Sequence, residues 1–140
     1  MIKMIANKQT RVMSLNALWV QPLTYVLETS PIEGKTYTGR YIGSTMNLCQ
    51  RWSQHKAGYG SKFCKQNPPL GFASVHVPPT DERAAGVMAY ENALTLQIMR
   101  DYIKKHGSDG WRSVRGGDYC ALSLQRPVAL GPDPVRRTSA

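Results

Sequence analysis

Acidic residues are scarce in this chain, and one long stretch has none. There are 9 aspartate and glutamate residues against 18 lysine and arginine residues, which gives a formal net charge of +9 at pH 7. A protein with this charge is repelled by basic surfaces and attracted to polyanions, so the composition predicts a nucleic-acid partner. The alternative is a basic face that is only solvated. Residues 35–80 contain no acid, and their basic residues are Lys35, Arg40, Arg51, Lys56, Lys62 and Lys65.

Long apolar runs and cysteine pairs are also missing. No apolar run approaches the roughly 18 residues of a membrane-spanning helix, so no membrane partner is expected. The cysteines, Cys49, Cys64 and Cys120, form no CxxC pair, which argues against a zinc site or a disulfide framework. Reduced thiols indicate the cytoplasm, that of a host cell if the chain is viral or from a mobile element. The alternative is a mitochondrial protein, because residues 1–12 carry basic residues and no acid.

One domain is expected from the length of 140 residues, and its fold class is predicted to be α+β. Residues 1–20 have no clean period and are expected to be a leader or a peripheral element. The domain itself is expected to cover 21–125. The proline-rich segment 126–140 is expected to be a disordered tail.

Three strands are predicted from β-branched and aromatic composition. Segments 24–27 and 37–42 flank a turn rich in proline and glycine, so residues 23–43 are expected to form an antiparallel hairpin. Segment 71–77 is expected to be the third strand. We therefore expect a small antiparallel or mixed three-stranded sheet flanked by helices.

Helices are predicted over 46–56, capped by a hydroxyl of Ser44 or Thr45, and as a short turn within 61–67. The longest helix is expected to begin near 80–83 and to end at 104–107, where basic residues and a glycine suit a C-terminus. Residues 111–117 are expected to be a loop.

Two helical side chains and two strand tyrosines are candidates for phosphate chemistry. Arg51 and His55 lie one turn apart on one helix face, where the guanidinium could hold phosphate oxygens and the imidazole could position a proton. Tyr25 and Tyr41 lie on the two hairpin strands, and a phenol acts as a base only if a cation lowers its pKa of about 10. The alternatives are surface positions for the first pair and core packing for the tyrosines.

Glu91 is the candidate metal ligand. It falls on the apolar stripe of the long helix, where an ionised carboxylate costs several kcal/mol unless a cation or donors compensate. One carboxylate with several waters is a plausible magnesium site. The alternative is a solvated glutamate at the edge of the stripe, whose apolar members are Val87, Leu94, Ile98 and Tyr102.

Together these residues resemble the GIY-YIG nuclease family. The second signature is present as Tyr41-Ile42-Gly43, and the segment 44–48 followed by Arg51 and His55 continues the resemblance. The first signature is reduced to Leu23-Thr24-Tyr25 and keeps only its tyrosine. Glu91 falls in the expected long helix, and the resemblance spans roughly residues 23–117.

The resemblance implies a stand-alone endonuclease that hydrolyses DNA phosphodiester bonds with one Mg²⁺ or Mn²⁺ ion. Tyr25 or Tyr41 would deprotonate the attacking water, Arg51 would hold the scissile phosphate, and His55 would assist. Glu91 would bind the metal. The family often has an asparagine after the carboxylate helix, and Arg115 is expected to replace it as a backbone or phosphate contact.

Contacts to the DNA backbone are expected from Arg40, Lys56, Lys62, Lys65 and Arg115. Trp111 and Tyr119 are expected to pack in the core, with base stacking as the alternative. No separate recognition domain is evident, so we expect low sequence specificity, structure-guided cutting or a partner protein that supplies specificity. The competing functions are a non-catalytic nucleic-acid-binding module on the same fold and a basic structural protein of a ribonucleoprotein.

Overall fold

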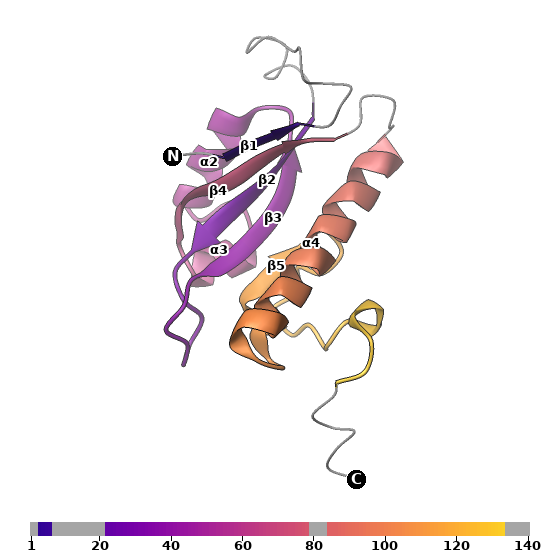
Figure 1. Cartoon of the computed structure of the whole chain (residues 1–140). Helices are drawn as coiled ribbons and strands as arrows, with labels where there is room; N and C mark the ends of the chain where they lie inside the picture. Colours follow the sequence, from indigo (N-terminus) through magenta and orange to yellow (C-terminus); the bar gives the residue numbers. More distant parts are fainter. Residues whose placement is uncertain (1–2, 7–21, 79–83, 134–140) are drawn as a thin grey trace.

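The computed structural model of the chain describes residues 3–6, 22–78 and 84–133 (Figure 1). It shows a five-stranded mixed sheet with the strand order β1-β4-β2-β3-β5 and helices on both faces. The expected α+β class is therefore confirmed. The strands are β1 (Lys3–Ala6), β2 (Leu23–Thr29), β3 (Gly39–Thr45), β4 (Pro69–Val77) and β5 (Val114–Gly116).

The central strands are antiparallel and the two edge strands are parallel to their neighbours. β2 pairs with both β3 and β4, so the predicted hairpin and the predicted third strand are confirmed. β1 and β5 raise the strand number above the expected three. They have four and three residues, which is too short for an alternation of apolar and polar residues to be recognised.

Helices α2 (Leu48–Lys56) and α3 (Lys62–Gln66) cover one face of the sheet, and α4 (Ala84–His106) covers the other (Figure 1). The side chain of Asn47 caps α2 by accepting a hydrogen bond from the backbone N–H of Gln50 at 3.0 Å. The predicted capping hydroxyls are therefore wrong, because β3 continues through them and ends at Thr45.

The ends of the other helices are explained by local residues. The predicted helical turn within 61–67 is confirmed as α3, and the Ser61 hydroxyl caps it. α4 ends at His106, and Gly107 follows with a φ of 107°, a conformation that glycine adopts at little cost. The predicted start of α4 at 80–83 lies outside the described residues. No helix among the described residues has the length and apolar character needed to span a membrane.

Two hydrophobic clusters fill the spaces between the sheet and its helices. Leu27, Val75 and other residues on one face of the sheet pack with residues of α2 and α3. Val26, Ile42 and others on the opposite face pack with Met99 and Tyr102 of α4. Since neighbouring strand residues such as Val26 and Leu27 point to opposite faces, β2 contributes to both clusters.

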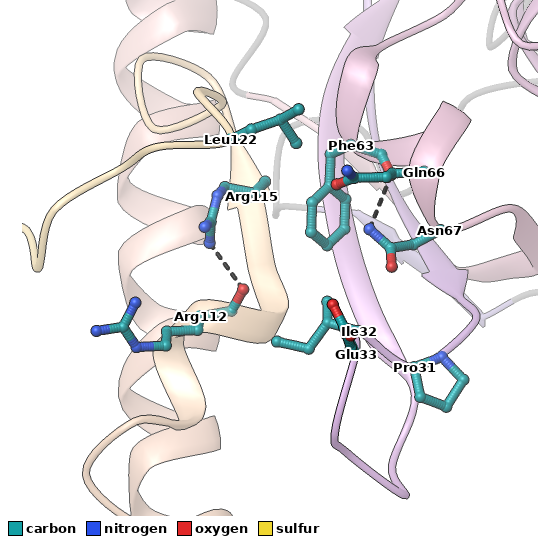
Figure 2. Close-up of a pocket in the computed structure, with 9 residues that line it drawn as sticks. All are labelled: Pro31, Ile32, Glu33, Phe63, Gln66, Asn67, Arg112, Arg115 and Leu122. Carbon is teal, nitrogen blue, oxygen red and sulfur yellow. Dashed lines mark hydrogen bonds between the residues drawn. The ribbon is translucent and has the colours of Figure 1, made fainter.

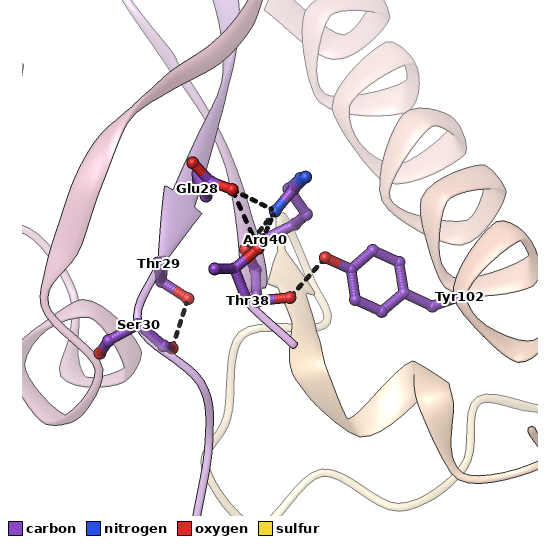
Figure 3. A network of polar contacts seen from close by, with 7 residues as sticks. Glu28, Thr29, Ser30, Thr38, Arg40 and Tyr102 are labelled. Carbon is purple, nitrogen blue, oxygen red and sulfur yellow. Dashed lines mark hydrogen bonds and ion pairs between the residues drawn. The ribbon is translucent and has the colours of Figure 1, made fainter. Parts of the chain in front are cut away.

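A polar network joins the hairpin to α4 (Figure 3). The Tyr102 hydroxyl donates a hydrogen bond to the carbonyl of Thr38 at 2.6 Å. Arg40 donates to the hydroxyl of Thr38 at 2.9 Å and lies 3.7 Å from a carboxylate oxygen of Glu28. The network holds the Arg40 guanidinium, whose side chain is still 26% exposed, and the expected DNA contact of Arg40 stays a prediction.

The segment after α4 is more regular than the predicted loop. Residues Gly110–Ser113 form the 3-10 helix η1, and β5 follows it directly. Trp111 is only 3% exposed and packs in the cluster under α4, and half-buried Tyr119 packs against the same cluster. The expected core positions of both aromatic residues are confirmed.

The expected tail is ordered where it is described. Residues 128–130 form the 3-10 helix η2 (Val128–Leu130), and the carbonyl of Ala129 accepts a hydrogen bond from Arg100 of α4 at 3.0 Å. The prediction of disorder is wrong for 126–133, because these contacts with α4 outweigh the proline-rich composition. Residues 134–140 lie outside the described part, as do 1–2 and 7–20 of the expected leader.

Candidate functional site

The candidate site lies where β3 extends beyond β5. β5 pairs with β3 only as far as Ile42, and β3 continues to Thr45. α4 brings Glu91 to this end of β3, where the Ser44 hydroxyl hydrogen-bonds to its carboxylate. Thr24 on β2 lies 3.1 Å from the same hydroxyl, oxygen to oxygen. The strand end thereby links the carboxylate of α4 to the hairpin.

Tyr25 and His55 form the buried hydrogen bond of the site. The Tyr25 hydroxyl oxygen lies 2.7 Å from Nε2 of His55, and the imidazole is 2% exposed. Burial, and to a smaller extent the nearby Arg51 guanidinium, together lower the pKa of His55 to about 4. His55 is therefore neutral near pH 7, and the pair connects a strand phenol to a helix imidazole.

Tyr41 lies against the same imidazole from the neighbouring strand. The ring centroids of Tyr41 and His55 are 5.4 Å apart, and the Tyr41 hydroxyl hydrogen-bonds to Ser61. Burial raises the pKa of Tyr41 to about 12 and raises that of Tyr25 still further. Both phenols are therefore protonated at neutral pH in the protein alone, because burial outweighs the opposing effect of Arg51 on Tyr25.

Arg51 presents an unsatisfied guanidinium to the cluster. Its Nη1 donates to the side-chain oxygen of Gln54 at 3.1 Å, while its buried Nε has no hydrogen-bond partner among the described residues. The guanidinium affects the pKa of Tyr25, His55 and Glu91. A half-buried cation with a free donor beside neutral phenols is suited to an anion.

Glu91 is a buried carboxylate, 6% exposed, on the inner face of α4. Burial raises its pKa, the Ser44 hydroxyl opposes this rise, and Asp118 adds to it. Glu91 forms no salt bridge with a described residue. The ionised form of a buried carboxylate without a salt bridge is stabilised when a cation binds to it.

Glycines allow the close approaches in the site. A Cβ atom at Gly43 would overlap the Tyr25 hydroxyl, and one at Gly60 would overlap the His55 imidazole. Gly117 has a φ of +50°, and a Cβ there would lie 3.4 Å from Oε2 of Glu91. These positions let the backbone contact the functional groups directly.

The structure thus brings together all five predicted site residues, Tyr25, Tyr41, Arg51, His55 and Glu91. Of the predicted basic contacts, Lys56, Lys62 and Lys65 are exposed on α2 and α3. Arg115 is 5% exposed, and its Nε and Nη1 donate to backbone carbonyls of Ala121, Arg112 and Val114.

Sequence reasoning missed the residues that hold Glu91. Ser44 was assigned to a helix cap but is a donor to Glu91. Asn92 donates to the Asp118 carboxylate at 2.8 Å and accepts from its backbone N–H at 2.9 Å, which fixes the turn at Gly117. The glycine pair at 116–117 was the available signal, because paired glycines allow a close backbone approach.

Residues 21–109 match the GIY-YIG catalytic domain. The match covers more than half of the 140 residues, so the chain belongs to the GIY-YIG nuclease family. The family assignment made from the signature residues is thereby confirmed. No match was found among curated proteins or among solved structures.

The residues of the cluster fit a metal site with a single protein carboxylate. In the described part of the chain, no group of three or more histidine, cysteine, aspartate or glutamate side chains is placed to hold a metal ion. Magnesium keeps several waters and can be held by one carboxylate. The unpaired, buried Glu91 supplies such a ligand, and a divalent cation would compensate its charge.

We expect the protein to lose stability as the pH falls from about 6.5 to about 4. The pKa of His55 is about 4 in the folded protein and 6.5 ordinarily, so within this window the unfolded chain binds a proton that the folded protein does not. The stabilisation is fully present above pH 6.5 and is lost as the pH falls. A difference of this size corresponds to about 3 kcal/mol.

Urea unfolding of the wild type and of His55→Gln at pH 7 and pH 4.5 measures this effect. The free energy of unfolding of the wild type should fall by about 2–3 kcal/mol more than that of the variant. Equal losses in the two proteins would show that His55 is not the group responsible.

Proposed function

We propose that this protein is a divalent-metal-dependent endonuclease that hydrolyses DNA phosphodiester bonds. The observation that carries the proposal is the meeting of two phenols, a guanidinium, an imidazole and a carboxylate at one end of β3. A domain that only bound nucleic acid would have no need for a buried carboxylate beside this cluster.

Glu91 would hold the metal ion. When bound, a Mg²⁺ or Mn²⁺ ion would supply positive charge for the leaving 3′ oxygen, which defines a one-metal mechanism. The Ser44 hydroxyl hydrogen-bonds to the carboxylate, and the glycine at 117 leaves the space beside Oε2 of Glu91 open. A carboxylate oriented by a hydrogen bond needs little rearrangement when the ion binds.

Arg51 would bind the scissile phosphate. Its free Nε and its remaining donors can contact non-bridging oxygens, whose charge increases in the transition state. The same positive charge would orient the phosphate for attack from the side of the tyrosines.

Tyr25 and Tyr41 would position the attacking water. Both phenols are protonated in the protein alone, so either can act as a base only when the charge of the bound complex lowers its pKa. The neutral His55 is in place to accept a hydrogen bond from Tyr25 at 2.7 Å. It would keep the phenol oriented while its oxygen faces the water.

The basic side chains of α2 and α3 would bind the DNA backbone. Lys62 lines an open cavity together with Tyr41, and the Cγ of Lys65 lies near Gly58, just after α2. Lys56 extends over the ring of Trp52, with its Nζ 5.7 Å from the ring centroid. Contacts of this type supply affinity without sequence choice, so specificity would come from DNA structure or from a partner protein.

The proposal is tested by incubating the purified protein with supercoiled plasmid, with Mg²⁺ or with EDTA. We expect nicking with Mg²⁺ and none with EDTA, while retention on DNA in a gel-shift assay changes little. Binding without cleavage under both conditions, with Mn²⁺ also inactive, would support the non-catalytic binding module instead. A strong preference for structured RNA would support the ribonucleoprotein alternative.

A further inference from the structure

A second cavity lies beside the candidate site and contains two arginines (Figure 2). It has a volume of about 480 Å³ and lies between η1–β5 on one side and α3 with the hairpin turn on the other. Arg112 and Arg115 form the first wall; Phe63, Gln66 and Asn67 belong to the second. The proposed mechanism uses none of these side chains.

Arg115 is a fixed cation in this cavity. Its Nε and Nη1 donate to three backbone carbonyls at 2.8–3.0 Å, and its guanidinium carbon lies 5.6 Å and 5.7 Å from the ring centroids of Phe63 and Trp111. Its Nη2 has no hydrogen-bond partner among the described residues. The side chain is therefore held in one orientation with a donor to spare.

Arg112 places a second positive charge nearby. Its guanidinium lies 4.8 Å from the ring centroid of Trp111 and is exposed. Burial and the charge of Arg112 together lower the pKa of Arg115 to about 10. No described acid forms a salt bridge with either arginine. Glu33 lines the same cavity and Asp109 lies near Arg112, but neither acid forms a salt bridge with an arginine, so both guanidinium groups can still bind an anion such as phosphate.

The cavity is larger than a phosphate and has polar groups on its opposite wall. Cavities of about 300–1,000 Å³ hold small organic ligands. The exposed amide of Gln66 offers a donor and an acceptor, the combination that contacts base edges in nucleic-acid complexes. Asn67 is 8% exposed and its Nδ2 already donates to the carbonyl of Phe63 at 3.1 Å, so Asn67 adds mainly its acceptor oxygen (Figure 2). Glu33 of the hairpin turn adds an acceptor. A phosphate together with its sugar and base matches both walls.

The cavity adjoins the proposed catalytic cluster. Leu122 lines this cavity and also the one that contains Tyr41 and Lys62. Phe63 of the first cavity stacks on Tyr41, with ring centroids 6.5 Å apart. A strand whose phosphate lies at the catalytic cluster can therefore place a neighbouring nucleotide in the arginine cavity.

We propose that this cavity receives one unpaired nucleotide of the DNA strand that is cut, with its phosphate at Arg112 and Arg115 and its base at Gln66 and Asn67. This rests on the proposed nuclease function. A base that remains stacked in a duplex cannot enter a cavity, so the substrate class is DNA with an unpaired nucleotide near the cut, as in a bulge or a flap.

The experiment compares two fluorescein-labelled duplexes that differ only in one bulged nucleotide. Dissociation constants are measured in EDTA, and cleavage rates are measured with Mg²⁺. The wild type should bind the bulged duplex about tenfold more tightly, the effect of one charge-assisted contact. Arg112→Ala should lose most of this preference. Gln66→Trp, which fills the cavity without removing a positive charge, should lose it as well.

Lys105→Ala is the matched control, because it removes an exposed positive charge at the far end of α4. It should keep the wild-type preference. Equal affinity of the wild type for both duplexes overturns the proposal, as does full preference in both Arg112→Ala and Gln66→Trp. Because binding is measured without metal, a protein that prefers the bulge but never cuts would contradict the nuclease function and leave the cavity assignment standing.

Discussion

Glu91→Gln will bind DNA and fail to cut it. Glutamine has the shape of glutamate and can still accept a hydrogen bond from Ser44, but it lacks the charge that a divalent ion requires. We expect the cleavage rate of supercoiled plasmid with Mg²⁺ to fall by about a thousandfold or more. The dissociation constant for a short duplex in EDTA should stay within about threefold of the wild-type value.

The fold of this variant should be unharmed. Burial raises the pKa of Glu91, so the charged carboxylate is disfavoured in the protein alone and its replacement removes a cost. We expect a melting temperature equal to or above that of the wild type. Asp101→Asn is the control, since this acid is exposed on the same helix and should leave cleavage unchanged. If Glu91→Gln nicked plasmid at the wild-type rate, Glu91 would not be the metal ligand.

Arg51→Ala will reduce both turnover and affinity. The guanidinium lies near enough to lower the pKa of Tyr25, His55 and Glu91, and its Nε has no hydrogen-bond partner among the described residues. We expect kcat to fall by about a hundredfold, as for other donors that stabilise transition-state charge, and KM to rise by about tenfold. Single-turnover cleavage of a labelled duplex over a range of protein concentrations separates the two effects.

Arg51→Lys distinguishes geometry from charge. Lysine keeps the positive charge but lacks the planar fork, so affinity should recover more than turnover does. Lys105→Ala serves as the control for a general loss of positive charge. If Arg51→Ala kept the wild-type kcat and changed KM alone, the residue would bind DNA without acting on the transition state.

The pKa directions restrict how the tyrosines can act. A nearby cation was expected to lower the pKa of one tyrosine. Burial instead outweighs the effect of Arg51 on the pKa of Tyr25, and it raises the pKa of Tyr41 to about 12. In the protein alone, the phenols are therefore hydrogen-bond donors. A tyrosine could act as a base only if the bound substrate and metal lowered its pKa. The hydrogen bond between Tyr25 and His55 therefore serves mainly to orient the phenol.

Strong local signals were sufficient to predict much of the fold. The hairpin was predicted from two β-rich segments around a proline and glycine turn, and the end of α4 from basic residues followed by Gly107. The edge strands β1 and β5 were not predicted, because an alternation of apolar and polar residues cannot be recognised in four or three residues. The ion pair between Arg40 and Glu28 was not predicted for a related reason, since the two residues are twelve positions apart in the sequence and adjacent only across the hairpin.

The sequence by itself determined the five groups of the candidate site and the family, because the signature around Tyr41, Arg51 and His55 and the carboxylate Glu91 are local patterns. The tertiary structure decided which other residues surround them. The surroundings of the site form only because β3 extends beyond β5 and α4 packs across the sheet. These surroundings include Ser44, Gly117 and the arginine cavity. Hydrogen bonds and buried charges between distant positions depend on chain packing, and no local pattern of residues encodes them.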